Sequence, residues 1–186
     1  MIPKVLRPAL RAVRHCPDRV LHASRRSALT HRLGERWPKE IGFVCYGNIC
    51  RSPYAEVAAA RAFRAFGNVA PRLWSAGFFG PGRGSPGRAL EAARERGLEL
   101  DPHRSQLITS RHLSADWIFV MEPFQVGEVV RQIGGGHLAL LGDLDPSGID
   151  TRAIPDPYSQ SLETFRACYA RIDRCVEELT RALRRV

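Results

Sequence analysis

The sequence predicts a single α/β domain with a four-stranded parallel sheet that helices flank on both faces, preceded by a basic segment. Three observations lead to this prediction. After Lys39, short apolar runs alternate with segments of helical periodicity, as a parallel sheet with helical crossovers requires. Glycine and proline separate these segments. The 186 residues, 44% of them hydrophobic, suffice for one compact core, and no run reaches the ~18 apolar residues of a membrane helix.

The first strand is expected at 41–45, where I-G-F-V-C forms a short apolar run. A helix is expected at 52–66, because Ser52 suits the N-cap and Pro53 suits the first helical position. The run R-L-W-S-A at 72–76 predicts the second strand. Strand, helix and strand thus follow one another as a parallel sheet requires.

The remaining elements continue the alternation. A Gly/Pro-rich loop at 77–87 precedes a helix that Gly97 ends, and the triple glycine at 134–136 ends a later helix. A second long loop is expected at 142–160. In chain order the expected elements are a helix at 88–96, a strand at 115–121, a helix at 122–133, a strand at 137–141 and a long helix from Ser161.

Residues 1–38 differ in composition from the rest of the chain. Of the formal net charge of +9, residues 1–39 carry +8, with ten Lys/Arg against two acids. Prolines interrupt the segment, so we expect residues 1–38 to form a partly disordered basic arm and residues 39–186 to form the domain. Such an arm can dock an anionic membrane surface or an acidic partner, and it also suits a transit peptide or a solubilising extension. The near-neutral remainder argues against nucleic-acid binding.

The stretch V-C-Y-G-N-I-C-R-S-P at 44–53 joins the first strand to the first helix, at the strand end where such sheets bind ligands. Gly47 permits a tight loop whose backbone amides converge on an anion, and the helix start adds its positive dipole end. Arg51 offers a planar fork for two oxygens of a phosphate-like group. These surroundings favour the thiolate of Cys45 and indicate phosphoryl transfer to sulfur. The simpler alternative makes Cys45 a buried strand residue and Arg51 a surface residue.

The cysteines indicate a reducing compartment. They stand at 16, 45, 50, 168 and 175, an odd number without the dense spacing of a disulfide framework or a C-x2-C zinc pair. No secretory signal follows Met1, so a cytoplasmic location is expected. Cys50 either packs within the loop or traps an oxidised Cys45 as a disulfide. Cys168 and Cys175 are expected in the core.

Six motifs carry the pattern, of which the first contains this loop and the other five lie beyond it. They are C-Y-G-N-I-C-R-S-P-Y-A-E at 45–56, S-A-G at 75–77, H-R-S-Q-L-I-T at 103–109, D-W-I-F-V-M-E at 116–122, I-P-D-P-Y at 154–158 and S-L-E-T-F at 161–165. Together they resemble the low-molecular-weight protein tyrosine phosphatases, over Ile41 to Leu183 and not over the basic arm. The loop F-F-G-P-G-R-G-S-P-G at 78–87 lacks tryptophan, and in this it resembles the corresponding loop of the bacterial branch that is associated with exopolysaccharide synthesis.

The resemblance implies catalytic roles for three residues. Cys45 would attack phosphorus and carry a phosphocysteine intermediate, and Arg51 would bind the phosphate oxygens together with the loop amides. Asp156 would protonate the leaving oxygen and then act as a base toward water. The phosphate-binding loop would comprise Tyr46, Gly47, Asn48, Ile49, Cys50 and Ser52.

The resemblance also implies a group of supporting residues. Asn48 would brace the loop in a hydrogen-bond network with Ser52, Ser75 and His103. Ser52 would in addition donate its hydroxyl to the sulfur of Cys45. His103 is expected to support the loop rather than to act as a general base.

The substrate slot is expected to be aromatic and aliphatic. Tyr46, Ile49 and Tyr158 would wall a slot deep enough for a phenyl phosphate, which favours phosphotyrosine over the shorter phosphoserine. No metal or other cofactor is expected, because Arg51 and the amides supply the positive charge.

The expected function is hydrolysis of phosphotyrosine by a monomeric enzyme. The resemblance suggests an autophosphorylated bacterial tyrosine kinase or another exopolysaccharide-synthesis protein as substrate. Thiol-dependent arsenate reductases share the fold but need relay cysteines after the second strand, and none lies between Cys50 and Cys168. A phosphotyrosine-binding module without turnover would have lost the thiol, the arginine or the aspartate, and all three are present.

Overall fold

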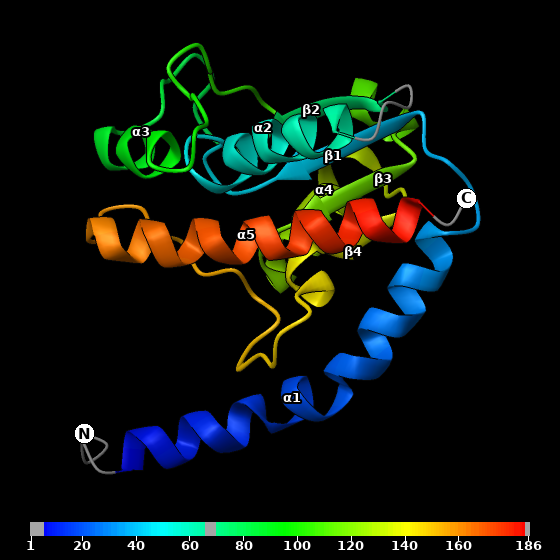
Figure 1. The fold of residues 1–186 in the computed structure, drawn as a ribbon, viewed down its shortest axis with the longest axis vertical. Coiled ribbons are helices and arrows are strands. Elements are labelled where there is room, and N and C mark those ends of the chain that lie inside the picture. The colour runs from blue at the N-terminus through cyan, green and yellow to red at the C-terminus, as the bar shows by residue number, and fades with distance from the viewer. Residues whose placement is uncertain (1–5, 66–69, 185–186) are drawn as a thin grey trace.

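The structure, a computed structural model, describes residues 6–65 and 70–184, with side chains from Pro17 onward. Four parallel strands form one sheet in the order β2-β1-β3-β4 (Figure 1). Their bounds are β1 (Glu40–Val44), β2 (Arg72–Ala76), β3 (Trp117–Val120) and β4 (Leu138–Leu140). Each lies within or overlaps an apolar run from which a strand was predicted, so the four-stranded parallel sheet is confirmed.

Helices cover both faces of the sheet, as predicted. The helical elements are α1 (Leu6–Leu33), α2 (Arg51–Arg64), α3 (Gly87–Arg94), η1 (Ser110–Ser114), α4 (Pro123–Ile133), η2 (Leu141–Leu144) and α5 (Leu162–Leu183). On one face α2 packs against β1 and β2, and α5 packs against α2 and α3. On the other face α4 contacts β3 and β4, with η1 beside it.

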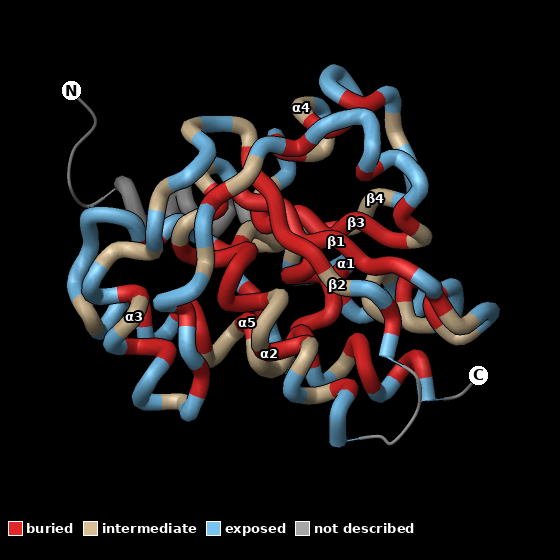
Figure 2. The backbone as a smooth tube through the Cα atoms, turned by 90° about the horizontal axis from the view of Figure 1, so that it is seen from above, coloured by how far each residue is buried: buried red, intermediate tan, exposed pale blue. Residues whose placement is uncertain are grey.

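The central strands β1 and β3 are buried over their whole length, and Figure 2 shows them as the buried centre of the molecule. Phe43 and Phe119 belong to the core under α2 and α5. Ile118 and Val120 belong to the second core, under α4. Burial on both faces explains why these strands appear in the sequence as continuous apolar runs rather than as alternating patterns.

The N-terminal segment differs from the expectation of a partly disordered arm. Residues Leu6–Leu33 form one continuous helix, α1, that includes Pro17. Residues 1–5 of the expected arm lie outside the described part of the chain. In Figure 1, α1 begins away from the sheet and its last turns approach the body of the protein. Among the described residues, no helix combines the length and the apolarity needed to cross a membrane.

Long-range contacts hold the C-terminal half of α1. The helix contacts α5 and η2, and Leu29 and Leu33 are buried in the core shared with α2 and α5. The Nε2 atom of His22 lies 2.7 Å from the carbonyl oxygen of Asp145, a residue 123 positions further along the chain. The apolar face of α1 is narrow and its partners are distant in sequence. The local pattern of the arm therefore could not reveal this packing.

Replacing Leu33 with alanine should destabilise the domain, because this side chain is fully buried. We expect the free energy of unfolding, measured in urea, to fall by about 2–4 kcal/mol. Leu21→Ala in the same helix is the matched control, since Leu21 is 45% exposed, and it should cost less than about 1 kcal/mol. Equal effects of the two substitutions would show that α1 is not part of the core.

Candidate active site

The loop at 45–50 connects β1 to α2 at the carboxyl end of the sheet. Because the strands are parallel, the segments that follow β2 and β3 reach the same edge. Gly77, directly after β2, approaches the loop closely: a Cβ there would lie 2.8 Å from the backbone nitrogen of Asn48 and from the carbonyl oxygen of Tyr46. Only glycine fits at this position, which explains the last residue of the S-A-G motif.

The backbone of the loop offers a row of hydrogen-bond donors. From Tyr46 to Cys50, none of the five amide N–H groups has an acceptor among the described residues. Asn48, in the middle of this row, has a left-handed backbone with φ of 50°, which asparagine tolerates better than most residues. A left-handed residue within a run of free amides is typical of an anion-binding concavity.

Cys45 lies at the base of this loop, and the residue as a whole is 2% exposed. The hydroxyl oxygen of Ser52 is 3.0 Å from the sulfur. Asn48 Nδ2 donates a hydrogen bond of 2.9 Å to the same hydroxyl, which leaves the hydroxyl proton available for the sulfur. A donor aimed at sulfur stabilises the thiolate relative to the thiol.

The guanidinium of Arg51 is buried beside the thiol, and two carboxylates contact it. Its Nη1 donates to Glu122 Oε2 at 2.7 Å and to the carbonyl oxygen of Ile154 at 2.8 Å, and its Nη2 lies 2.7 Å from Asp156 Oδ2. Burial lowers the pKa of Arg51, but the charges of Cys45, Asp156 and Glu122 outweigh burial and raise it overall. The Nε atom has no hydrogen-bond partner among the described residues, so one edge of the fork is available to a ligand.

Asp156 reaches the site from the loop between η2 and α5. Its side chain is 41% exposed, and its Oδ1 accepts a hydrogen bond of 3.2 Å from the backbone N–H of Tyr158. Its Oδ2 pairs with Arg51. The structure therefore brings Cys45, Arg51 and Asp156 together from segments that are far apart in the sequence.

Asn48 is the centre of a buried hydrogen-bond network behind the loop. Besides Ser52, its Nδ2 donates to the hydroxyl of Ser75 at 2.9 Å. The Nε2 atom of His103 lies 2.7 Å from the carbonyl oxygen of Asn48, so this nitrogen donates. The backbone N–H of Gln106 donates to Asn48 Oδ1 at 2.8 Å. The four residues that the resemblance grouped are thus in contact, and Gln106 joins them.

A cavity of about 200 Å³ opens above the thiol. Its walls are mainly aromatic and aliphatic, and the ring of Tyr46 stacks on Phe79 with centroids 6.3 Å apart. The lining residues are Cys45, Tyr46, Gly47, Ile49, Cys50, Phe79, Arg83, Asp156 and Tyr158.

Sequence reasoning did not single out four residues at this site. Glu122 ends the motif at 116–122, directly after an expected strand, and Gln106 stands in the motif at 103–109, three residues after His103. These positions could have indicated that both residues belong to the site. Phe79 and Arg83 stand in the Gly/Pro-rich loop after β2, where the sequence indicates no direction for a side chain.

Two further thiols lie near Cys45. Cys50 is buried and lines the cavity, and burial raises its pKa, with the charges of Cys45 and Asp156 adding to the effect. Burial raises the pKa of Cys168 to about 12. Both groups are therefore thiols at neutral pH. Cys45, Cys50, Cys168 and Cys175 are all free, whereas the side chain of Cys16 lies outside the described part of the chain.

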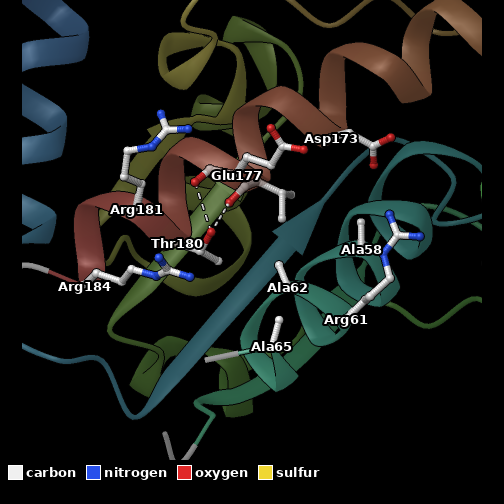
Figure 3. Close-up of a pocket in the computed structure, with 10 residues that line it drawn as sticks. Ala58, Arg61, Ala62, Ala65, Asp173, Glu177, Thr180, Arg181 and Arg184 are labelled. Atoms are coloured by element: carbon white, nitrogen blue, oxygen red, sulfur yellow. Dashed lines mark hydrogen bonds between the residues drawn. The ribbon is translucent and has the colours of Figure 1, made fainter. Parts of the chain in front are cut away.

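A second hollow, of about 390 Å³, lies between α2 and α5 (Figure 3). Ala58 and Ala62 on α2, with Ala65 directly after the helix, form one wall. On the other side, Thr180 of α5 donates its hydroxyl to carbonyl oxygens of its own helix. None of the described residues that line it is a cysteine or a histidine, and it lies away from the end of the sheet where the thiol stands. The loop after β1 is therefore the candidate active site.

Comparisons with known proteins agree with this geometry. Residues 40–186 match the profile of the low molecular weight phosphotyrosine protein phosphatases. The phosphatase Wzb of Escherichia coli K12 is 33% identical over 144 residues, which cover 75% of this chain and 92% of that protein.

Two solved structures extend the comparison. The tyrosine phosphatase amsI of Erwinia amylovora superposes with a TM-score of 0.71 at 29% identity, over 80% of this chain and 95% of that one. The YwlE arginine phosphatase of Geobacillus stearothermophilus superposes with a TM-score of 0.67 at 26% identity, over 77% and 92%. The profile match covers most of the chain, and on that ground the protein belongs to the low molecular weight phosphotyrosine protein phosphatase family.

Proposed function

We propose that the protein hydrolyses phosphotyrosine through a phosphocysteine intermediate on Cys45. One observation carries the proposal: a buried thiol lies beneath five free amides, with the guanidinium of Arg51 and the carboxylate of Asp156 beside it. Donors that are already in place around a nucleophile stabilise the charge that builds up on a transferring phosphoryl group. No metal is needed for this, because Arg51 and the amides supply the positive charge.

In the first step the sulfur of Cys45 attacks phosphorus and the bond from phosphorus to the tyrosine oxygen breaks. The loop amides and Arg51 hold the three equatorial oxygens. A phosphate oxygen that binds Nη2 of Arg51 replaces the Asp156 carboxylate there, because the two occupy the same donor. The carboxyl group of Asp156, carrying the proton that it takes from water in the second step of each cycle, is then free to protonate the leaving oxygen, which matters because tyrosine has a pKa of about 10.

In the second step water attacks the phosphocysteine, and the bond from phosphorus to sulfur breaks. Asp156, now ionised, takes a proton from the water. Ser52 donates its hydroxyl to the departing sulfur, at the 3.0 Å contact, and so stabilises the thiolate. Inorganic phosphate is released, and the thiolate is ready for the next substrate.

The character of the slot supports phosphotyrosine as the substrate. Tyr46, Phe79 and Tyr158 surround it, so a phenyl ring finds apolar partners there. Phosphoarginine is the rival substrate, because one structural neighbour is an arginine phosphatase. Asp156 is the only acid among the lining residues, and Arg83 would repel a guanidinium.

The direct test compares three peptides of one sequence that carry phosphotyrosine, phosphoserine or phosphoarginine, without added metal. We expect the highest kcat/KM for phosphotyrosine. A preference for phosphoarginine would contradict the proposal. Phosphotyrosine binding without turnover would indicate a binding module, and arsenate reduction supported by thioredoxin would indicate a reductase.

The resemblance to the bacterial branch leads us to propose an autophosphorylated tyrosine kinase or another exopolysaccharide-synthesis protein as the substrate. The free thiols at 45, 50, 168 and 175 support a reducing, cytoplasmic location. We further propose that residues 39–186 are the catalytic domain of a monomer. Residues 1–38, whose helix α1 packs its C-terminal half on that domain, would be a basic segment that touches an anionic membrane surface or an acidic partner.

Glu122→Gln should weaken catalysis without unfolding the protein, because it removes the carboxylate that holds Nη1 of Arg51. We expect kcat/KM for phosphotyrosine to fall about 10- to 100-fold, the effect of losing one charge-assisted hydrogen bond in a buried pair. Glu128→Gln in α4, the helix that Glu122 caps, is the matched control, since the partner of Glu128 among the described residues is the exposed Arg131. Equal activities of the two variants would show that Glu122 does not orient Arg51.

A further inference from the structure

We propose that Arg83 at the mouth of the cavity selects phosphotyrosines that have a negatively charged group beside them, either a carboxylate or a second phosphate. The inference rests on the proposed function, because it concerns which phosphotyrosines the same site accepts. It follows from how Arg83 is held and from the charges around it.

Backbone oxygens fix the guanidinium of Arg83. Its Nε donates to the carbonyl oxygen of Gly80 at 2.8 Å, and its Nη2 donates to those of Gly47 and Phe79 at 2.8 and 2.6 Å. Its central carbon lies 5.1 Å from the centroid of the Phe79 ring. Gly80 makes room for this arrangement, because a Cβ there would lie 2.7 Å from Nε. The side chain is therefore held before any substrate binds, which reduces the entropy cost of a contact.

No carboxylate offsets the positive charge of Arg83 in the described part of the chain. Its hydrogen bonds go to neutral carbonyl groups. Its Nη1 has no partner in the same part of the chain, so two N–H donors remain for a ligand. Because Arg83 lines the cavity that also exposes Cys45, a group bound to Nη1 would lie beside the phosphotyrosine.

Two more arginines contact segments next to the lining residues, and neither has a carboxylate partner among the described residues. Arg104 hydrogen bonds only to backbone oxygens, and its Nη1 would lie 3.7 Å from a Cβ at Gly84. Arg88 donates to the carbonyl oxygen of Gln160, two residues after Tyr158. Uncompensated positive charge around an opening attracts anionic ligands. The rim thus suits a substrate with negative charge next to its phosphotyrosine.

The experiment uses the full-length protein and one phosphotyrosine peptide with a single flanking position varied among glutamine, glutamate and phosphoserine. We expect kcat/KM at low salt to be about three- to tenfold higher for the charged flanks than for glutamine. High salt should reduce this ratio, because it screens exposed charges. Comparing kcat/KM for the glutamate peptide with that for the phosphoserine peptide shows whether Arg83 prefers a carboxylate or a phosphate.

Arg83→Gln should bring the ratio close to one, and Arg83→Lys should restore part of it. Arg64→Gln is the matched control: it removes the same charge from an exposed arginine at the far end of α2, about 20 Å from the loop, and should keep the ratio. A wild type that hydrolyses free phosphotyrosine but treats all three peptides alike would overturn the inference and leave the proposed function standing. So would an Arg83→Gln variant that keeps the ratio. Failure to hydrolyse any phosphotyrosine would overturn both.

Discussion

Replacing Cys45 with serine is expected to lower kcat for p-nitrophenyl phosphate by at least about 10⁴-fold, because it removes the nucleophile itself. A serine hydroxyl is not ionised in a loop whose donors suit a thiolate, so it is a far weaker nucleophile than the sulfur that it replaces. The measurement is steady-state hydrolysis without added metal.

The control for this substitution is Cys175→Ala in α5. Cys175 is buried in the core and lies outside the cavity, so its loss should leave kcat within a fewfold of the wild-type value. Phosphate or vanadate binding by the Cys45→Ser variant would show that the loop is still folded. Substantial hydrolysis by that variant would mean that another group is the nucleophile.

Asp156→Asn is expected to lower kcat for phosphotyrosine about 10²- to 10⁴-fold, the usual contribution of a general acid. The loss should depend on the leaving group. It should be largest for phosphotyrosine, whose leaving oxygen has a pKa of about 10, and smaller for p-nitrophenyl phosphate, whose leaving group needs less help. The measurement is kcat for a series of aryl phosphates, plotted against the pKa of the leaving group, for the wild type and for Asp156→Asn.

Asp150→Asn provides the matched control for Asp156→Asn. Asp150 stands on the same long loop, is exposed, and pairs with Arg19 of α1 rather than with Arg51. This variant should retain the wild-type rates with every leaving group. An Asp156→Asn variant that loses the same factor with all leaving groups would show that the aspartate positions Arg51 and does not donate a proton.

Much of the fold and the centre of the site could be predicted from the sequence. β1 and β3 are buried on both faces, so they appear as unbroken apolar runs that are hard to mistake. Gly134, at the end of α4, and Gly97, after α3, both have a positive φ, which favours glycine. Such glycines are local signals for the end of a helix. Cys45 and Arg51 lie within one loop, so their proximity follows from the chain itself.

The rest depends on contacts between distant segments. The resemblance, rather than any local pattern, pointed to Asp156, which reaches Arg51 from 105 positions away. Glu122 contacts Arg51 and Arg83 contacts Gly47 from two other segments, and no periodicity indicates where a side chain on a loop points. α1 was missed for the same reason, because the core into which Leu33 packs is built largely by α2 and α5.

The central claim is that the phosphoryl group passes through the sulfur of Cys45. Rapid mixing of wild-type protein with p-nitrophenyl phosphate, denaturation within the first turnover and mass spectrometry of the resulting peptides test it directly. We predict one phosphoryl group on the peptide that contains Cys45, and none on the same peptide of a Cys45→Ala control, which has no side-chain nucleophile there. Hydrolysis at full rate with no phosphoryl group on Cys45 at any time, or with the group on another residue, would contradict the mechanism.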